Sequence, residues 1–508
     1  MKADRILCII LAITGLVVSA CSEDKGNYSY TQINEVTIDS LLSSYTFEAG
    51  SHVLIKPDIR SLDEASADLS YSWTIGETEL STDPILDIVL PPLDYGQQLA
   101  ALTIIDNVTK MQYRQTFNIN IVNSFNWGYY FLTRKDDGST EMAYIQATKD
   151  KEPTMEDVKY ATGCGDYQFG NEPSQLSGSF GYMLDSYYWT ITILTREGEF
   201  PAIVTNNATF EASSLITEES FSDQEAGYHF KPEMTISTIR KEQYFLSDGQ
   251  FIKYVKNSAG QGKLYRPAQH DKEYRWNFPV FAGNGLTNCY VFDELSHRYY
   301  VLEPYTTSDP ASGIFADANA LDKVVEISNN RDIEGNIVYA FGESYQNNCY
   351  VYSVADDGIH VYFFNGDNSG NYELVSEDML PLSGLSEQPA FAVGIGISGN
   401  KWYTNSGNTI YASPIISPKL DSWLQLPADL GLGTIERIGF SAQGTRMIVV
   451  LYDENSNKER KGSVIFIDVE TKQITHKFPN ILHHCVDYLK GNSCEPNYAG
   501  QGSFGDDK

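Results

Sequence analysis

The chain has 508 residues, of which 67 are acidic and 36 are basic, and its formal net charge is −31. Phosphate backbones and anionic lipid headgroups repel a protein this acidic, so we expect no nucleic-acid partner and no membrane binding through a basic patch. The length exceeds what one hydrophobic core usually supports, which predicts two or more domains.

The N-terminus has the pattern of a lipoprotein signal. A short basic region precedes residues 6–18, an apolar run that is too short to span a bilayer. The small residues Ser19 and Ala20 come directly before Cys21, as signal-peptide cleavage requires. We therefore predict that residues 1–20 are a signal peptide and that Cys21 is the lipid-modified first residue of the mature protein. The alternative is an ordinary secretory signal followed by a chance cysteine.

A polar, partly acidic segment follows this cysteine. Ser22, Glu23 and Asp24 resemble the surface-export signal of Bacteroidetes lipoproteins, and that resemblance implies a position on the outer face of the outer membrane. A periplasmic location is the alternative. We expect residues 21–44 to form a lipidated tether that lets a folded body stand away from the membrane.

Residues 45–123 are predicted to form a small β-sandwich. Short segments alternate apolar and polar residues, the period of half-buried strands, and Trp73 has the position of a core-filling tryptophan on a central strand. The expected strands are 53–55, 69–75, 86–89, 101–105 and 117–121.

This segment resembles a polycystic-kidney-disease (PKD) repeat, an immunoglobulin-like module of extracellular proteins. The resemblance is carried by Gly50 with the strand after it, by residues 69–73 and by residues 102–106. The opening residues 21–30 are similar to the PKD-like lipoproteins of Bacteroidetes. One departure is Gly76-Glu77-Thr78, where a PKD repeat typically has a Gly-Asp-Gly turn.

Residues 124–490 change to a series of aromatic-rich strand pairs separated by Gly, Asn, Asp and Ser turns. Approximate repetition of this kind predicts a β-propeller, and turns such as Asp137-Gly138 and Asp248-Gly249 favour tight hairpins. The expected fold class is thus all-β, an immunoglobulin-like sandwich followed by a propeller of about seven blades and a flexible tail at 491–508. Six or eight blades, a jelly roll or a second pair of sandwiches are the alternatives. The expected units are 127–147, 179–212, 234–267, 278–304, 324–365, 390–416 and 438–474.

The cysteines give little chemistry. Apart from Cys21, the predicted mature chain has five, an odd number that excludes complete internal pairing. Only Cys485 and Cys494 are close enough in sequence to suggest a local disulfide, and we expect the other three to be buried, inert thiols. The five are Cys164, Cys289, Cys349, Cys485 and Cys494.

No motif predicts a metal, a cofactor or a catalytic centre. His483-His484-Cys485 contains two types of zinc ligand, but adjacent residues on a strand point to opposite faces. The loop 453–459 has oxygen ligands at alternate positions, yet Lys458 occupies the place where a calcium loop needs Gly, so we expect a solvated hairpin tip. There is no Gly-x-Ser-x-Gly elbow, and chance pairs of carboxylates are expected everywhere in so acidic a chain.

Aromatic side chains are the remaining candidates for ligand binding. Sugar rings and apolar peptide side chains dock on exposed Trp and Tyr faces, and the propeller-like part has several aromatic positions, including Trp276, Trp402-Tyr403 and Trp423. Blades also pack on aromatics, so we interpret each of these as a core residue and assign none to a site.

The sequence favours a non-enzymatic binding or scaffolding protein on the outer surface. The resemblance to PKD-like lipoproteins implies partnership with SusC-like transporters and SusD-like lipoproteins, which import oligosaccharides or peptides. A surface propeller hydrolase acting on glycans or peptides is the alternative, and it predicts carboxylates with raised pKa values that converge at one mouth of the channel. A purely structural role as an envelope spacer is a third hypothesis.

Overall fold

A computed structural model of the chain describes residues 35–488 apart from several gaps. The longer gaps are 63–67, 123–127, 147–152, 221–228, 238–242, 257–261, 266–272, 283–287, 304–322 and 395–399. The chain divides into two units at residue 121. The described residues are all-β, with three short 3-10 helices, and none of their helices has the length and apolarity that crossing a bilayer would need.

The first unit is a β-sandwich. A five-stranded sheet has the order β2-β9-β8-β5-β6, and the pairs β3–β7 and β1–β4 complete the unit. Its strands are β1 (Val36–Asp39), β2 (Ser44–Glu48), β3 (His52–Ile55), β4 (Asp58–Ser61), β5 (Leu69–Ile75), β6 (Thr78–Ser81), β7 (Leu86–Val89), β8 (Gly96–Asp106) and β9 (Gln112–Val122).

Alternating side chains build the sandwich core. Val53 and Ile55 of β3 point inward and pack with Leu102 and Ile104 of β8, while the residues between them face solvent. Trp73 is 1 % exposed, donates its indole N–H to the carbonyl of Asp83 at 2.8 Å and so fills the core as expected.

The tether expected over residues 21–44 is too long. Strand β1 lies inside that range and pairs with β4, and Val36 is 5 % exposed within the sandwich core. Burial of this apolar side chain holds the segment to the folded unit. The predicted signal peptide at 1–20 and the tail at 491–508 lie outside the described residues.

The second unit is a propeller. Its described residues contain seven four-stranded antiparallel sheets. From the inner strand outward these are β39 (His484–Tyr488), β10 (Gly128–Arg134), β11 (Thr140–Gln146), β12 (Val158–Ala161); β15 (Asn171–Met183), β16 (Ser186–Glu197), β17 (Ala202–Asn206), β18 (Ala212–Ile216); β19 (Pro232–Ser237), β20 (Gln243–Ser247), β21 (Gln250–Lys256), β22 (Gly262–Tyr265); β23 (Trp276–Ala282), β24 (Asn288–Asp293), β25 (Arg298–Glu303), β26 (Lys323–Glu326); β27 (Asn336–Gly342), β28 (Cys349–Ala355), β29 (Gly358–Gly366), β30 (Tyr372–Leu380); β31 (Phe391–Gly394), β32 (Lys401–Ser406), β33 (Thr409–Pro414), β34 (Asp421–Gln425); and β35 (Thr434–Phe440), β36 (Arg446–Tyr452), β37 (Gly462–Asp468), β38 (Ile474–Leu482).

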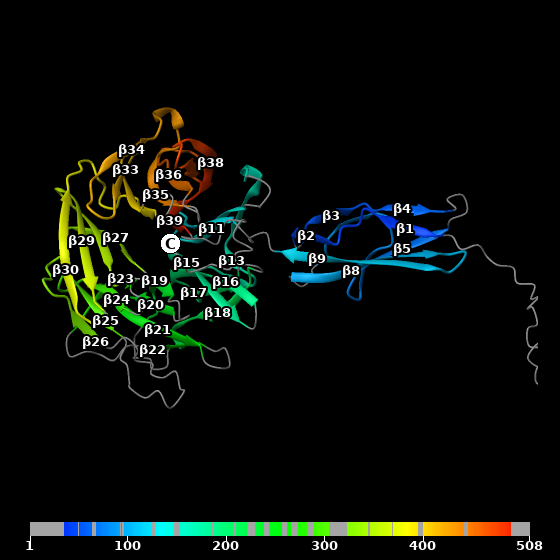
Figure 1. The fold of residues 1–508 in the computed structure, drawn as a ribbon, viewed down its shortest axis with the longest axis horizontal. Helices are drawn as coiled ribbons and strands as arrows, with labels where there is room; N and C mark the ends of the chain where they lie inside the picture. The colour runs from blue at the N-terminus through cyan, green and yellow to red at the C-terminus, as the bar shows by residue number, and fades with distance from the viewer. Residues whose placement is uncertain are drawn as a thin grey trace, which may run out of the picture. The chain divides into compact units, whose positions relative to one another are not determined.

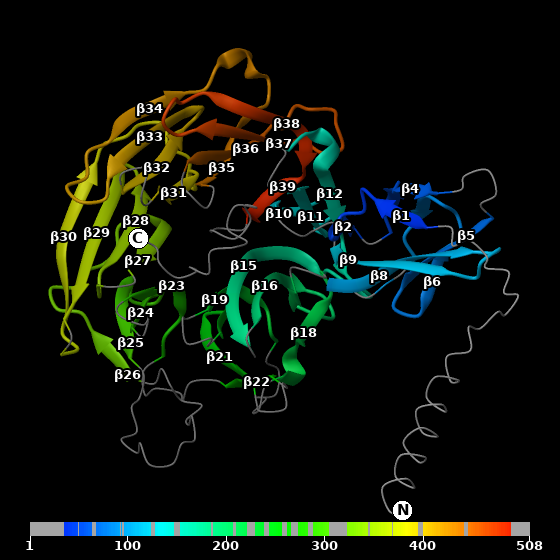
Figure 2. The same cartoon turned by 45° about the vertical axis from the view of Figure 1, so that its right-hand side comes forward.

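The sheets are set side by side around a common centre (Figures 1 and 2). Neighbouring sheets contact one another around the ring through β15 with β19, β20 with β23, β23 with β27, β27 with β31 and β31 with β35, and β39 contacts both β35 and β15. The remaining elements are the hairpin β13 (Gly163–Cys164) with β14 (Tyr167–Gln168) and the 3-10 helices η1 (Met155–Asp157), η2 (Glu218–Ser220) and η3 (Ala428–Leu430).

The burial of each strand follows from its place in a sheet. Middle strands such as β10 and β37 are buried on both faces, because neighbouring sheets cover them, and they have continuous apolar runs. The outer strand β30 instead alternates buried and exposed residues over its first half. The bounds of the unit expected over 324–365 were wrong. Its first strand, β26, pairs with β25 and so belongs to the preceding sheet.

The C-terminal strand closes the ring. Strand β39 pairs with β10 and so completes the first sheet. Beside it, Arg460 from the β36–β37 loop donates two hydrogen bonds, at 2.9 and 3.0 Å, to the carboxylate of Glu141 on β11. Lys135 and His483 also approach this carboxylate, each at 3.6 Å. We call Lys135, Glu141, Arg460 and His483 the closure cluster.

Candidate metal centre

One sheet of the propeller brings an imidazole and two carboxylates together. His360 lies on β29 and Glu377 on β30, where the register pairs His360 with Met379 and Glu377 with Tyr362. His360 and Glu377 are therefore diagonal neighbours on the same face of the sheet, within reach of each other. Glu334 comes from the loop before β27.

Glu334 is held by its backbone rather than by its side chain. Its amide N–H donates to the hydroxyl of Tyr362 at 2.9 Å, and its carbonyl accepts a hydrogen bond from Ser353. The next residue, Gly335, has φ +75°, and a Cβ there would lie 2.1 Å from the carbonyl oxygen of Val354. Glycine thus lets this loop lie against β28, while the Glu334 side chain stays exposed.

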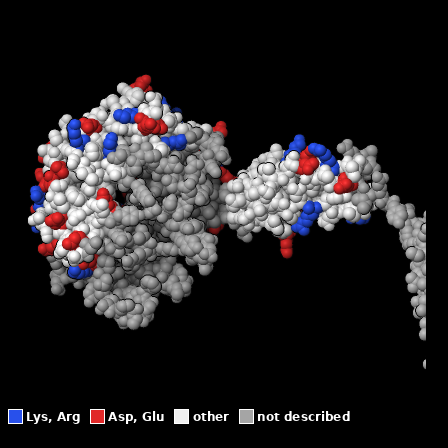
Figure 3. Space-filling view, in the orientation of Figure 1, with Lys and Arg blue, Asp and Glu red and all other residues white. Residues whose placement is uncertain are grey.

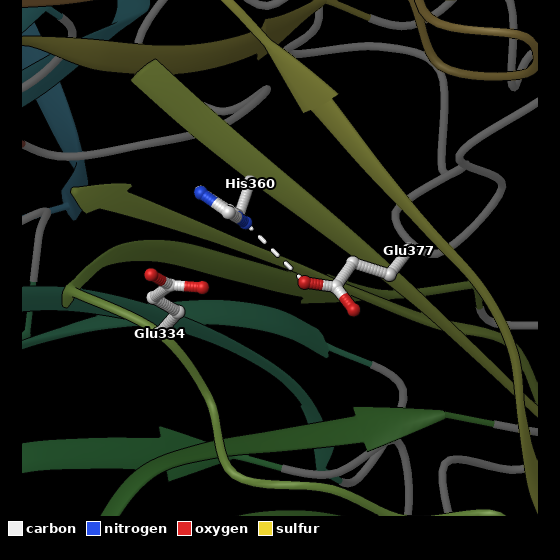
Figure 4. A group of neighbouring side chains, drawn as sticks. All are labelled: Glu334, His360 and Glu377. Carbon is white, nitrogen blue, oxygen red and sulfur yellow. Dashed lines mark hydrogen bonds and ion pairs between the residues drawn. The ribbon is translucent and has the colours of Figure 1, made fainter. Parts of the chain in front are cut away.

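The three side chains converge, as Figure 4 shows. One ligand atom from each of Glu334, His360 and Glu377 lies within 4.8 Å of the other two. The Nδ1 atom of His360 is 3.3 Å from Oε1 of Glu377. The imidazole is buried, at 4 % exposed, whereas Glu334 faces solvent, so the group is open on one side.

Asp357 orients the imidazole. Its carboxylate lies 2.9 Å from Nε2 of His360 and fixes the ring so that Nδ1 is directed toward Glu377. The tight turn that places Asp357 needs Gly358, because φ is +148° there and a Cβ would lie 2.2 Å from the Leu380 carbonyl oxygen. We call Glu334, Asp357, His360 and Glu377 the cation cluster.

The charges around the cluster are unbalanced. Burial lowers the pKa of His360, but hydrogen bonds to Asp357 and Glu377 outweigh it, so the pKa is raised. The hydrogen bond between Asp357 and His360 also lowers the pKa of Asp357. Arg331 donates to Oε2 of Glu377 at 2.7 Å and leaves Oε1 for the centre of the cluster. With a neutral imidazole, three carboxylates and one guanidinium leave a net charge of −2.

Sequence reasoning missed this group. Glu334, His360 and Glu377 are far apart in sequence, and no metal motif contains them. The one local signal is Asp357-x-x-His360 across a hairpin turn, which places a carboxylate beside the imidazole. The acidic composition hid it, because carboxylates near a histidine are common in such a chain.

The His483-His484-Cys485 segment does not form one site. His484 contacts Glu436 at 3.0 Å, whereas His483 is directed to Glu141 of the closure cluster. Burial lowers the pKa of His483. The thiol of Cys485 is buried and donates to the Asp487 carbonyl at 3.6 Å. The imidazoles of His483 and His484 thus contact different carboxylates.

The described cysteines are buried thiols. Cys164, Cys289 and Cys349 are free, and burial raises the pKa of each, for Cys164 to about 12. Thiolates do not form readily in such surroundings, so these residues are inert as expected. Cys494 lies outside the described residues, and its disulfide with Cys485 stays a prediction.

The aromatic candidates that can be placed are core residues. Trp276 is 8 % exposed, and Trp402 and Tyr403 are 0 % and 1 % exposed. Trp423 is half-buried and lies 5.5 Å from the ammonium group of Lys472. The loop at 453–459 joins β36 to β37, and Asp453 accepts a hydrogen bond from the Asn455 amide, as a hairpin tip would.

The predicted anchor cannot be placed, since Cys21, Ser22, Glu23 and Asp24 lie outside the described residues. On the view of Figure 3, basic and acidic side chains are interspersed over the described part of the propeller surface. The large negative charge is therefore not gathered into one patch on that face.

The fold and the site define an all-β protein with an immunoglobulin-like sandwich followed by a propeller. Residues 21–172 match the PKD-like family, so the N-terminal part of the chain is PKD-like, as the sequence resemblance indicates. The match extends past the sandwich into the first sheet of the propeller. A comparison with curated proteins finds no match.

Solved structures with a similar course of the chain share little sequence. A quinonprotein alcohol dehydrogenase-like protein from Bacteroides thetaiotaomicron is 12% identical, with a TM-score of 0.44, and the alignment covers 86% of this chain and 93% of that one. The dihydro-heme d1 dehydrogenase NirN is 9% identical, with a TM-score of 0.42 and coverage of 76% and 72%. Virginiamycin B lyase from Staphylococcus aureus is 11% identical, with a TM-score of 0.33 and coverage of 64% and 92%. The propeller assignment itself rests on the ring of four-stranded sheets in this chain.

Proposed function

We propose that this chain is a lipid-anchored binding protein on the outer surface of the outer membrane, a non-enzymatic accessory of a SusC/SusD-like uptake complex for oligosaccharides or peptides. The observation that carries the proposal is the PKD-like match, which begins at Cys21, the residue predicted to become the lipidated start of the mature chain. A sandwich followed by a propeller suits a protein that captures a ligand or partner outside the cell.

Several carboxylates of the described residues are held by partners within the chain. Glu141 is held by Arg460, and Glu436 accepts hydrogen bonds from His484 and the Cys485 amide. Burial raises the pKa of Glu233. It is paired with Arg196 at 3.6 Å, which is not the pair of carboxylates that glycoside hydrolysis uses.

The anchor is tested by replacing Cys21 with Ser. We expect wild-type protein in the detergent phase of cell extracts and the variant in the aqueous phase, because acyl chains supply the membrane affinity. Protease treatment of intact cells should remove the wild-type protein, and replacement of Ser22, Glu23 and Asp24 by Ala should protect it inside the envelope. Protease resistance of the wild-type protein in intact cells would contradict surface display.

The partnership is tested by purifying the wild-type protein in mild detergent from its native membrane and identifying the proteins that co-purify. A SusC-like transporter and a SusD-like lipoprotein are expected. Recovery of the chain alone would refute the uptake-complex role while leaving the anchor intact.

A further inference from the structure

We propose that Glu334, His360 and Glu377 bind one divalent transition-metal ion of the zinc class, with Asp357 as the residue that orients the imidazole. This site is separate from the proposed surface role and stands or falls independently of it. An imidazole nitrogen with two carboxylate oxygens is a donor set that zinc accepts in proteins.

The distance between the two most ordered donors suits two ligands of one metal ion. Two donor atoms that each lie about 2.0–2.1 Å from a tetrahedral ion are roughly 3.3–3.4 Å apart. Nδ1 of His360 and Oε1 of Glu377 are separated by 3.3 Å, longer than the usual 2.7–3.2 Å of an N–H···O hydrogen bond. An ion between them would require little movement of either strand.

The third donor, Glu334, has a fixed backbone and a side chain that can move. The backbone of Glu334 is held by Tyr362 and Ser353, so its position beside β29 is set before an ion arrives. Its side chain is exposed, and a change of rotamer can bring its carboxylate closer to the other two donors, which already lie within 4.8 Å. The open side leaves a fourth position for water.

The surroundings favour a divalent cation. Asp357 accepts a hydrogen bond from the Nε2–H group of His360. Metal-binding histidines ordinarily make such a contact with a carboxylate through their second ring nitrogen. Arg331 occupies only Oε2 of Glu377 and is mostly exposed, so it offsets part of the negative charge without filling the centre. The net charge of −2 would be neutralised by one divalent ion.

The test titrates the full-length chain, prepared without a polyhistidine tag and stripped with EDTA, with Zn²⁺ alone. We expect one Zn²⁺ per chain, a loss of binding in His360→Gln, and at least a tenfold weaker affinity in Glu334→Gln. The control is His229→Gln, because His229 is an exposed imidazole that also contacts a carboxylate, Glu218, at 2.9 Å. This control should bind as the wild type does.

Two outcomes would overturn the proposal: no binding of Zn²⁺ at micromolar concentration by the wild type, or equal binding by the wild type and Glu334→Gln. Glu334 is exposed, so this variant decides the question even where His360→Gln fails to fold. Displacement of Zn²⁺ by equimolar Ca²⁺ would also overturn it, because calcium takes oxygen donors and leaves the imidazole without a role.

The positioning role of Asp357 has its own test. Asp357→Asn should weaken Zn²⁺ binding ten- to hundredfold, while Asp356→Asn, at the neighbouring exposed position of the same turn, should leave it unchanged. NMR of the His360 ring should show the Nε2-protonated tautomer in the wild type and lose that preference in Asp357→Asn. An unchanged tautomer and affinity would refute the role.

Discussion

Two carboxylate–imidazole clusters of the propeller unit differ in how the chain balances their charges. In the closure cluster the carboxylate is buried, with the Glu141 side chain 5 % exposed, and a guanidinium neutralises it. In the cation cluster the imidazole of His360 is buried, and an excess of carboxylates surrounds it. The same residue types therefore give a carboxylate neutralised by a guanidinium in one place and an excess of carboxylates around one imidazole in the other.

The difference follows from the sheet geometry. Glu141 lies on a middle strand, where the neighbouring sheet covers it, so its charge requires a cation from the chain itself. Arg460 supplies that charge and also lies over the ring of Tyr160 at 3.9 Å. Glu377 lies on the outer strand of its sheet, where the mostly exposed Arg331 pairs with it, and Glu334 is exposed, so that water screens its charge.

The largest expected effect is the loss of Arg460. Arg460→Ala leaves a buried carboxylate with only Lys135 and His483, each at 3.6 Å, and we expect the free energy of unfolding to fall by about 3 kcal/mol. Urea unfolding of the full chain measures it. The control is Arg298→Ala: Arg298 and its partner Asp332 are both exposed, so the loss of this pair should cost much less stability. Equal losses in the two variants would show that the closure cluster does not hold the ring.

The second effect is stabilisation by metal. Zn²⁺ at about 100 times its dissociation constant should raise the free energy of unfolding by about 2.7 kcal/mol, and EDTA should remove the gain. Arg460→Ala should keep this increment, since its cluster is separate, whereas His360→Gln should lose it. An increment that persists in His360→Gln would place the ion elsewhere.

The third effect is a pH dependence that comes from the closure cluster. Burial is the main cause that lowers the pKa of His483 below 6.5. The nearby charges of Arg460 and Lys135 lower it further, whereas the charge of Glu141 raises it. The unfolded chain therefore takes up this proton first as pH falls, and stability is lost below about pH 6.5. His483→Gln should lose less stability than the wild type between pH 7.5 and 5 in urea unfolding. A parallel pH profile would contradict the assignment.

The smallest effect is expected at Glu334. In EDTA, Glu334→Gln should change the free energy of unfolding by less than about 0.5 kcal/mol, because the side chain is exposed. Glu141→Gln should cost several times more, since it leaves Arg460 without a partner. A large loss in Glu334→Gln would mean that the cation cluster is a structural network like the closure cluster.

The fold class and most of the sandwich could be predicted from the sequence. The strands at 69–75 and 86–89 have the bounds of β5 and β7 because alternation between buried and exposed residues is local. The start of the sandwich was missed, because the short strand β1 carries few apolar residues to signal it. The cation cluster could not be predicted, since its register and turns join residues far apart in the sequence.

The sequence by itself determined where strands and hairpins form, because side-chain periodicity and Asp-Gly turns act over a few residues. Only the tertiary structure decided which strands share a sheet, as with β26, and that β39 completes the sheet of β10. It also decided that His483 lies beside one neutralised carboxylate, whereas His360 lies beside an excess of carboxylates. Such contacts depend on the register and on the path of loops, which pair residues that the local pattern cannot relate.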